Sequence, residues 1–181
     1  MGNPRPKAGA DETGRWLYNR QPAMKGTDFD ELAFFRAIAG SGARALLIGR
    51  RALVVLGLPV LTADYDFWLH IDDIERFNET LAPFDLAPTH GADDARQRGR
   101  YALENDEHVD VLIARAVPAV DGQRVTFDEV WDGRRAVALT DDVSVFLPSH
   151  AALILTKRFA ARPKDLEDIR LLHLTGPEGE S

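Results

Sequence analysis

Residues 61–69 read LTADYDFWL, a β-strand pattern that carries two carboxylates and is the most informative stretch of the chain. Residues i and i+2 of a strand lie on the same face, so the side chains of Asp64 and Asp66 are expected to crowd one small volume. Carboxylates held that close raise each other's pKa unless a positive charge intervenes. A divalent cation bound through oxygen, commonly Mg²⁺ with a substrate phosphate, is the usual remedy. An exposed strand can also carry such a pair by chance.

Two flanking stretches favour a functional role for the Asp64–Asp66 pair over a chance occurrence. Upstream, residues 46–52 (LLIGRRA) form an apolar run that breaks at Gly49 and then turns helix-like. Downstream, residues 108–113 (HVDVLI) form a second apolar strand that carries Asp110. The chain therefore shows a strand, a glycine turn, a helix, a strand with two aspartates and a later strand with a third aspartate, in that order.

This order resembles the nucleotidyltransferase superfamily with the polymerase-beta-like fold, whose members place a glycine turn, a D-x-D strand and a third carboxylate on a neighbouring strand. Residues 149–169 (SHAALILTKRFAARPKDLEDI) are similar to the helix–turn–helix segment of AbiEii-like nucleotidyltransferases, and the pattern is also close to aminoglycoside-adenylyltransferase-like enzymes. The resemblance spans residues 44–172. It implies an α/β (α+β) fold in which a mixed β-sheet is flanked by helices, with a C-terminal helix pair.

The resemblance also implies a site. Asp64, Asp66 and Asp110 would be the catalytic carboxylates and the ligands of Mg²⁺, with Mn²⁺ as an alternative, and Asp110 would serve as the base. An NTP would be the substrate. The implied nucleotide-binding set is Gly49, Arg50, Arg51, Thr62, Lys157, Arg162, Lys164, Asp165 and Asp168.

The chain departs from the family pattern at the glycine turn. Relatives carry a small residue after the glycine, where this chain has Arg50 and then Arg51, and many carry an arginine near the position of Val60. The two guanidinium groups could hold phosphates in bidentate fashion, or they could block the pocket. Both alternatives remain open at this stage.

Ordinary structural roles compete with the functional ones. Asp64 could simply end a strand, and Lys157 could be a helix-surface lysine. Lys164 and Asp168 are spaced i,i+4 and could form a surface pair. The five histidines show no ligand spacing, so no role is assigned to them.

Composition bounds the function classes. The 181 residues are 45% hydrophobic and 28% charged, which suits one globular domain. The net charge of −7 disfavours nucleic-acid binding through bulk electrostatics, although a local basic patch could still bind nucleic acid. The chain has no cysteine, which excludes disulfides, a thiol nucleophile and cysteine-ligated zinc.

Two clusters of arginines are interpreted as solvated surface. They are Arg96, Arg98 and Arg100, and Arg134 with Arg135.

The chain is expected to contain an extended N-terminal arm at 1–26, a single domain at 27–176 and a flexible tail at 177–181. Trp16 and Tyr18 of the arm could dock on the body or on a second subunit, which would make a homodimer. No apolar run approaches the ~18 residues of a membrane span, and the N-terminus lacks a signal-peptide pattern, so a cytoplasmic location is expected.

Hydrophobic periodicity predicts the elements of the domain. Helices are expected from Thr27 to Gly40 and at 50–57, 71–81, 127–131, 149–161 and 164–174. Strands are expected at 44–48, 64–70, 100–105, 108–114, 135–139 and 143–147. Residues 90–99 are polar and are predicted to be a mobile loop, with the question of a lid left open.

Three functional hypotheses follow. The first is a Mg²⁺-dependent nucleotidyltransferase that moves an NMP onto a hydroxyl of a small molecule, a tRNA or a protein, including the toxins of toxin–antitoxin systems. The second is a catalytically degenerate member of the fold that acts as a nucleotide-binding or protein-interaction module. The third is a metal-dependent phosphohydrolase that uses the same carboxylates.

Overall fold

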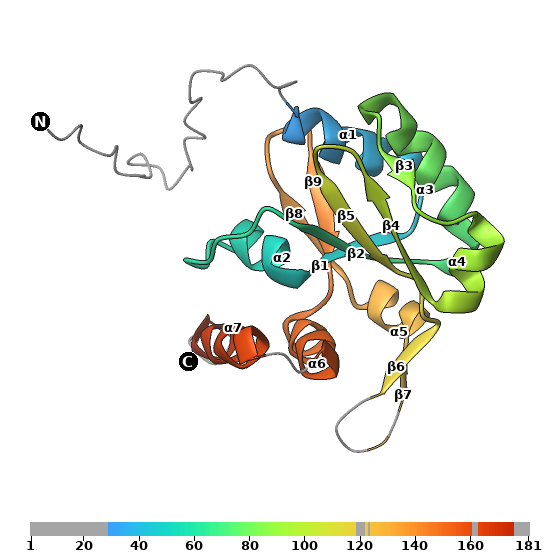
Figure 1. Cartoon of the computed structure of the whole chain (residues 1–181). Coiled ribbons are helices and arrows are strands. Elements are labelled where there is room, and N and C mark those ends of the chain that lie inside the picture. Colours follow the sequence, from blue (N-terminus) through green and yellow to red (C-terminus); the bar gives the residue numbers. More distant parts are fainter. Residues whose placement is uncertain (1–28, 119–121, 123, 161–162, 176–181) are drawn as a thin grey trace, which may run out of the picture.

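A five-stranded mixed sheet organises the computed structural model, which describes residues 29–118, 122, 124–160 and 163–175 (Figure 1). The helices are α1 (Glu31–Ser41), α2 (Gly49–Val55), α3 (Ile74–Leu81), α4 (Ala92–Arg98), α5 (Phe127–Asp132), α6 (His150–Ala160) and α7 (Pro163–Thr175), with short 3₁₀ turns η1 (Ile71–Asp73) and η2 (Ala82–Phe84). The strands are β1 (Ala45–Ile48), β2 (Tyr65–Leu69), β3 (Ala87–Pro88), β4 (Arg100–Glu104), β5 (His108–Leu112), β6 (Ala116–Pro118), β7 (Arg124–Thr126), β8 (Arg135–Ala138) and β9 (Ser144–Leu147).

The main sheet has the strand order β1-β2-β5-β4-β3. Strands β2 and β5 run parallel, while the other neighbouring pairs are antiparallel. The pairs β6-β7 and β8-β9 form two separate hairpins. This arrangement confirms the predicted mixed sheet flanked by helices, with α6 and α7 as the C-terminal helix pair.

Apolar side chains pack on both faces of the sheet. On one face, Phe34 of α1 and Phe77 of α3 meet Phe67 of β2 in a cluster of tilted and edge-to-face rings. On the other face, Trp68 of β2 packs on Phe127 of α5. Figure 1 shows α1 and α3 above the sheet and α5 and α6 below it. The alternation along β2 therefore sends its odd-numbered and even-numbered residues to different cores, as the strand period requires.

The boundaries predicted from the sequence hold to within one to three residues for most elements. The exception at the start is α1, which begins at Glu31 because Asp30 accepts a hydrogen bond from the backbone N–H of Ala33 at 2.9 Å. The predicted start at Thr27, the arm at 1–26 and the tail at 177–181 lie outside the described residues. No helix in the described ranges is long and apolar enough to cross a membrane.

The predicted mobile loop at 90–99 is wrong, because these residues contain the helix α4. Acidic residues in its first turn and basic residues in its last turn complement the helix dipole, and Gly99 ends it in the left-handed region at φ 73°. Arg96 also anchors the helix to α3 through a 2.6 Å ion pair with Glu75. Ala95 is the single buried residue of α4, so the sequence offered no large apolar stripe to reveal it.

A buried carboxylate ties the start of β1 to η1. Asp73 accepts hydrogen bonds from the backbone N–H of Arg44 at 2.9 Å and from its guanidinium at 2.8 Å. Burial of Asp73 opposes ionisation, but these hydrogen bonds outweigh it and lower the pKa of the carboxyl below its ordinary value. A lowered folded-state pKa stabilises the protein above the unfolded-state pKa of about 3.9, and this stability is lost as the pH falls through the folded-state pKa.

Asp73→Ala is therefore expected to lower the free energy of unfolding at pH 7 by about 1–2 kcal/mol, since the pair is only partly shielded from water. Urea unfolding at pH 7 and pH 3 measures the effect, and the difference from the wild type should shrink at pH 3. Asp72→Ala is the matched control, because that side chain is 72% exposed. An equal loss of stability at both pH values would contradict the electrostatic explanation.

Candidate active site

Asp66 and Asp110 lie side by side, because they are register partners in the parallel strands β2 and β5. Asp66 is half-buried, whereas the Asp110 side chain is 58% exposed. Asp64 lies just before β2 and is exposed, with its backbone N–H donating to the Thr62 hydroxyl at 3.1 Å. The buried Tyr65 between the two aspartates is consistent with the predicted alternation of this stretch.

Gly49 forms the turn between β1 and α2 directly beside Asp66. Its φ of +65° lies in the left-handed region that favours glycine. A Cβ atom at this position would lie 2.0 Å from Oδ2 of Asp66. The glycine predicted from the sequence is therefore needed both for the turn and for the close approach of the carboxylate.

A pocket of about 360 Å³, lined by both charged and apolar side chains, opens beside these residues. Its wall includes Gly49, Asp66, Asp110, Arg100, Lys157 and Asp165. These residues come from the turn after β1, from three neighbouring strands and from the C-terminal helix pair. Pockets of roughly 300–1,000 Å³ accommodate small ligands, so this one is large enough for a small-molecule substrate.

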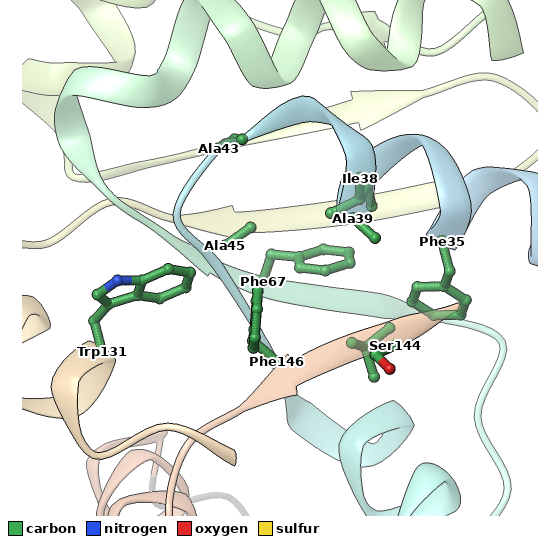
Figure 2. Close-up of a pocket in the computed structure, with 11 residues that line it drawn as sticks. Phe35, Ile38, Ala39, Ala43, Ala45, Phe67, Trp131, Ser144 and Phe146 are labelled. Atoms are coloured by element: carbon green, nitrogen blue, oxygen red, sulfur yellow. The ribbon is translucent and has the colours of Figure 1, made fainter. Parts of the chain in front are cut away.

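A second pocket, of about 100 Å³, lies elsewhere, among α1, α5 and β9. Figure 2 shows its wall of rings and small side chains, including Phe35, Phe67, Trp131 and Phe146. Among the residues that the structure describes, no acidic or basic side chain lines it. Group transfer needs charged groups at the reacting atoms. The pocket of about 360 Å³, which charged side chains help to line, is therefore the candidate active site.

Lys157 of α6 lines the candidate active-site pocket and belongs to a buried cluster of charged side chains. Its Nζ lies 2.7 Å from Oδ2 of Asp168 and 3.7 Å from Oδ1 of Asp165. Lys157 is 3% exposed, and both aspartates, which come from α7, are buried. The alternative of a helix-surface lysine is therefore wrong. So is the pairing of Asp168 with Lys164, because Lys164 is exposed and Asp168 faces Lys157.

Arg50 lies behind this cluster and not on the pocket wall. Its Nε is 3.2 Å from Oδ2 of Asp168, and one Nη is 3.1 Å from Oδ1 of the same carboxylate. A longer contact of 3.7 Å reaches the exposed Glu167. In this structure Arg50 neither faces the pocket nor blocks it, and instead joins the glycine turn to α7.

Arg51 points to the opposite side of α2. Its guanidinium forms a 3.0 Å ion pair with Glu31, donates to the carbonyl of Ala63 at 3.3 Å and stacks 4.3 Å from the ring centroid of Tyr65. The Tyr65 hydroxyl also donates to Glu31, at 3.0 Å. Burial, reinforced by the Glu31 charge, raises the pKa of Tyr65 above its ordinary value, so the ring remains a neutral donor. These contacts join α1 to the segment that leads into β2.

The structure thus gathers only part of the set predicted from the sequence. Gly49, Asp66, Asp110, Lys157 and Asp165 line one pocket, and Asp168 supports it from behind. The residues that do not line it are Asp64, Thr62, Arg50, Arg51 and Lys164. Arg162 lies outside the described residues.

Two polar residues near the pocket were not assigned from the sequence. Arg100 was interpreted as solvated surface, and it is exposed in the structure; it also lines the pocket from the start of β4, opposite Leu112 of β5. His108 lies between Glu104 and Asp110, at 3.2 and 3.3 Å. Strand alternation in β4 and β5 places these residues on one face of the sheet. The register that sets them beside Asp66 depends on how distant strands pair, which the sequence does not show.

The divalent metal that the resemblance implies can be tested against these donors. Within the described residues, no group of three or more His, Cys, Asp or Glu side chains could hold a metal ion by itself. Asp66 and Asp110 still provide two adjacent carboxylates, and Mg²⁺ is commonly bound by one or two carboxylates together with substrate phosphates. The donors present therefore fit a metal that binds together with a triphosphate.

Solved nucleotidyltransferase structures share this fold. The antibiotic-resistance factor ANT(2'')-Ia in solution is 15% identical, with a TM-score of 0.57 over 79% of this chain and 80% of that one. Its crystal structure with adenylyl-2''-tobramycin is 16% identical, with a TM-score of 0.56 over 79% and 85%. A Thermotoga maritima protein described as a candidate nucleotidyltransferase is 13% identical, with a TM-score of 0.52 over 76% and 86%.

No protein-family model matches the sequence, and no curated protein matches it either. At such low identities the structural likeness shows the fold alone. The chain has a nucleotidyltransferase-like fold, which confirms the resemblance at the level of architecture.

Proposed function

We propose that this protein is a Mg²⁺-dependent nucleotidyltransferase that moves an NMP from an NTP to a hydroxyl acceptor. One observation carries the proposal: Asp66 and Asp110 are register partners beside the Gly49 turn, in a pocket that also contains Lys157 and Arg100. Paired carboxylates and nearby cations are what transfer of a charged phosphoryl group requires. The shared fold supports the same class.

In the proposed reaction the acceptor hydroxyl attacks the α-phosphorus of the NTP. A new O–P bond forms, the bond between the α-phosphorus and the bridging oxygen breaks, and pyrophosphate leaves. Asp110 is the more exposed of the two carboxylates and takes the hydroxyl proton, while the missing side chain of Gly49 leaves room for the Asp66 carboxylate. Mg²⁺, held by Asp66, Asp110 and the phosphates, would supply charge neutralisation and lower the pKa of the attacking hydroxyl.

Two basic side chains among the described residues, Lys157 and Arg100, line different parts of the pocket wall. Lys157 approaches from α6 and Arg100 from β4, so they reach the pocket from different elements. We assign Lys157 to the β- and γ-phosphates, with Arg100 as an additional contact for the triphosphate. Arginine can bind a phosphate in bidentate fashion, whereas lysine acts as a point charge.

We propose a small hydroxylated molecule as the acceptor. The net charge of −7 disfavours a tRNA acceptor, and one structure that shares the fold holds an adenylylated aminoglycoside. A protein acceptor, as in a toxin of a toxin–antitoxin system, would need a docking surface that the pocket itself does not supply.

Calorimetric titration of each NTP into the protein tests the proposal. At least one NTP is expected to bind with Mg²⁺ present and to bind at least about tenfold more weakly with EDTA, because the triphosphate and two carboxylates share the metal. Pyrophosphate release on addition of an acceptor would then establish transfer. Binding of no NTP under either condition would overturn the proposal, and release of inorganic phosphate without an acceptor would favour the phosphohydrolase.

A catalytically degenerate nucleotide-binding protein is the second candidate. The absence of a three-ligand metal group among the described residues favours it. So does the pairing of Arg50 with α7 at a turn where relatives carry a small residue. Metal-independent NTP binding without pyrophosphate release, across a panel of hydroxylated acceptors, would support this candidate.

A further inference from the structure

Three charged side chains follow one another away from the candidate active site. Lys157 lines the pocket, Asp168 lies behind Lys157, and Arg50 lies behind Asp168. Asp168 is fully buried and does not line the pocket. Its carboxylate thus stands between a lysine that faces the proposed nucleotide and an arginine that does not.

This arrangement poses a problem for nucleotide binding. Lys157 Nζ lies 2.7 Å from Asp168 Oδ2, so it is already engaged by a carboxylate. Turning Nζ toward a phosphate would weaken that contact. A buried carboxylate that loses its counter-charge is strongly disfavoured, which would oppose binding unless another cation holds Asp168.

Arg50 supplies that second cation. It contacts both oxygens of Asp168, with Nε 3.2 Å from Oδ2 and one Nη 3.1 Å from Oδ1. The Nε contact is a hydrogen bond, whereas the Nη contact to Oδ1 is an ion pair without hydrogen-bond geometry. The guanidinium thus provides a counter-charge for Asp168 that does not depend on Lys157. The Arg50 side chain is 24% exposed, so water only partly screens the pair.

Resting on the function proposed above, we infer that Arg50 is a positioning residue for Lys157. Arg50 keeps Asp168 paired, so that the Lys157 ammonium is available to the nucleotide phosphates. Because Arg50 follows Gly49 directly, the same contact connects the glycine turn to α7. The arginine at a position where relatives carry a small residue thus acts through Asp168 and not by touching the triphosphate.

Two other roles for Arg50 make different predictions. If Arg50 bound the phosphates itself, it would have to leave Asp168, and its removal could not be compensated at Asp168. If Arg50 only held α7 against the body of the protein, its removal would lower the melting temperature without changing the affinity of the folded protein for an NTP.

The test compares Arg50→Met, Arg50→Lys and the double variant Arg50→Met/Asp168→Asn. Calorimetry with Mg²⁺ and the NTP that the wild type binds gives Kd, and thermal unfolding gives Tm. Arg50→Met is expected to weaken NTP binding about tenfold or more, because Lys157 is then the one cation among the described residues that is paired with Asp168. Adding Asp168→Asn should restore Kd to within about threefold of the wild type, because the neutral amide no longer needs a cation.

Glu167→Gln is the matched control, since Glu167 is 73% exposed and lies 3.7 Å from Arg50; its Kd should stay unchanged. Arg50→Lys keeps the charge but loses the two-point contact, so an intermediate Kd is expected, and it replaces Arg50→Met if that variant does not fold. A double variant as weak as Arg50→Met would overturn the inference in favour of direct phosphate contact. Unchanged Kd with lowered Tm would overturn it in favour of a purely structural role.

Failure of the proposed function is distinguishable from failure of this inference. Absence of NTP binding by the wild type overturns the proposed function, and this inference falls with it. Normal binding by the wild type, together with normal binding by both Arg50 variants, overturns the inference alone.

Discussion

Asp66→Asn is expected to reduce nucleotidyl transfer by about 10²–10³-fold or more while leaving the fold intact. Asp66 is the half-buried carboxylate of the register pair, held against Gly49 at the edge of the pocket. The amide has nearly the same shape as the carboxylate, so packing is preserved while the negative charge is removed. Mg²⁺-dependent binding of the NTP should weaken as well, because one of the two proposed protein ligands of the metal is lost.

The measurement combines calorimetry of Mg²⁺ and NTP with the rate of pyrophosphate release once an acceptor is known. Asp106→Asn is the matched control, because Asp106 is an exposed aspartate in the turn between β4 and β5 and does not line the pocket. The control should behave as the wild type does. An Asp66→Asn variant with unchanged Mg²⁺-dependent affinity would remove Asp66 from the metal site and, with it, the main support for the proposed function.

Gly49→Ala should damage both stability and nucleotide binding. The left-handed backbone at φ +65° disfavours any L side chain by about 1–2 kcal/mol. The new Cβ would also lie 2.0 Å from Asp66 Oδ2, so the carboxylate or the turn must move. We expect a Tm lower by several degrees, and an NTP affinity reduced at least tenfold, because the displaced carboxylate no longer lies beside Asp110.

Gly57→Ala separates these two effects. Gly57 also has a left-handed backbone, at φ +81°, but a Cβ there would meet no atom within 4 Å. Its substitution should lower Tm through backbone strain alone and leave NTP affinity unchanged. Thermal unfolding and calorimetry on both variants provide the comparison. Equal affinities for Gly49→Ala and Gly57→Ala would show that the close approach of Gly49 to Asp66 has no part in nucleotide binding.

Local sequence patterns were enough to predict the central part of the fold. Alternation along 61–69 predicts a strand with Asp64 and Asp66 on one side, and the structure has β2 at Tyr65–Leu69, with Tyr65 and Phe67 buried on either side of Asp66 and with Asp64 just before the strand. The glycine after the first strand predicts a turn, and Gly49 adopts a positive φ. These features depend on residues close together in the chain, so the sequence contains the information directly.

The same patterns failed where local signals were weak. Helix α4 buries Ala95 alone, so no large apolar stripe marks it, and its N-cap residue Gly91 has no side chain to cap the first turn. Small elements such as β3, β6 and β7 span two or three residues each, too few for a periodicity to appear. Their existence depends on strand pairing, for example Ala116 opposite Thr126, and not on their own composition.

Within the candidate site, the sequence by itself determined the kinds of residue available: the three aspartates, the glycine turn and the lysine of the C-terminal helix pair. The tertiary structure decided which of them meet. Register between β2 and β5 sets Asp66 beside Asp110, and the contact of α6 with α2 and with α7 brings Asp168 to Arg50, 118 positions away. Strand and helix periods are local, whereas these contacts depend on how distant elements pack, which no spacing along the chain specifies.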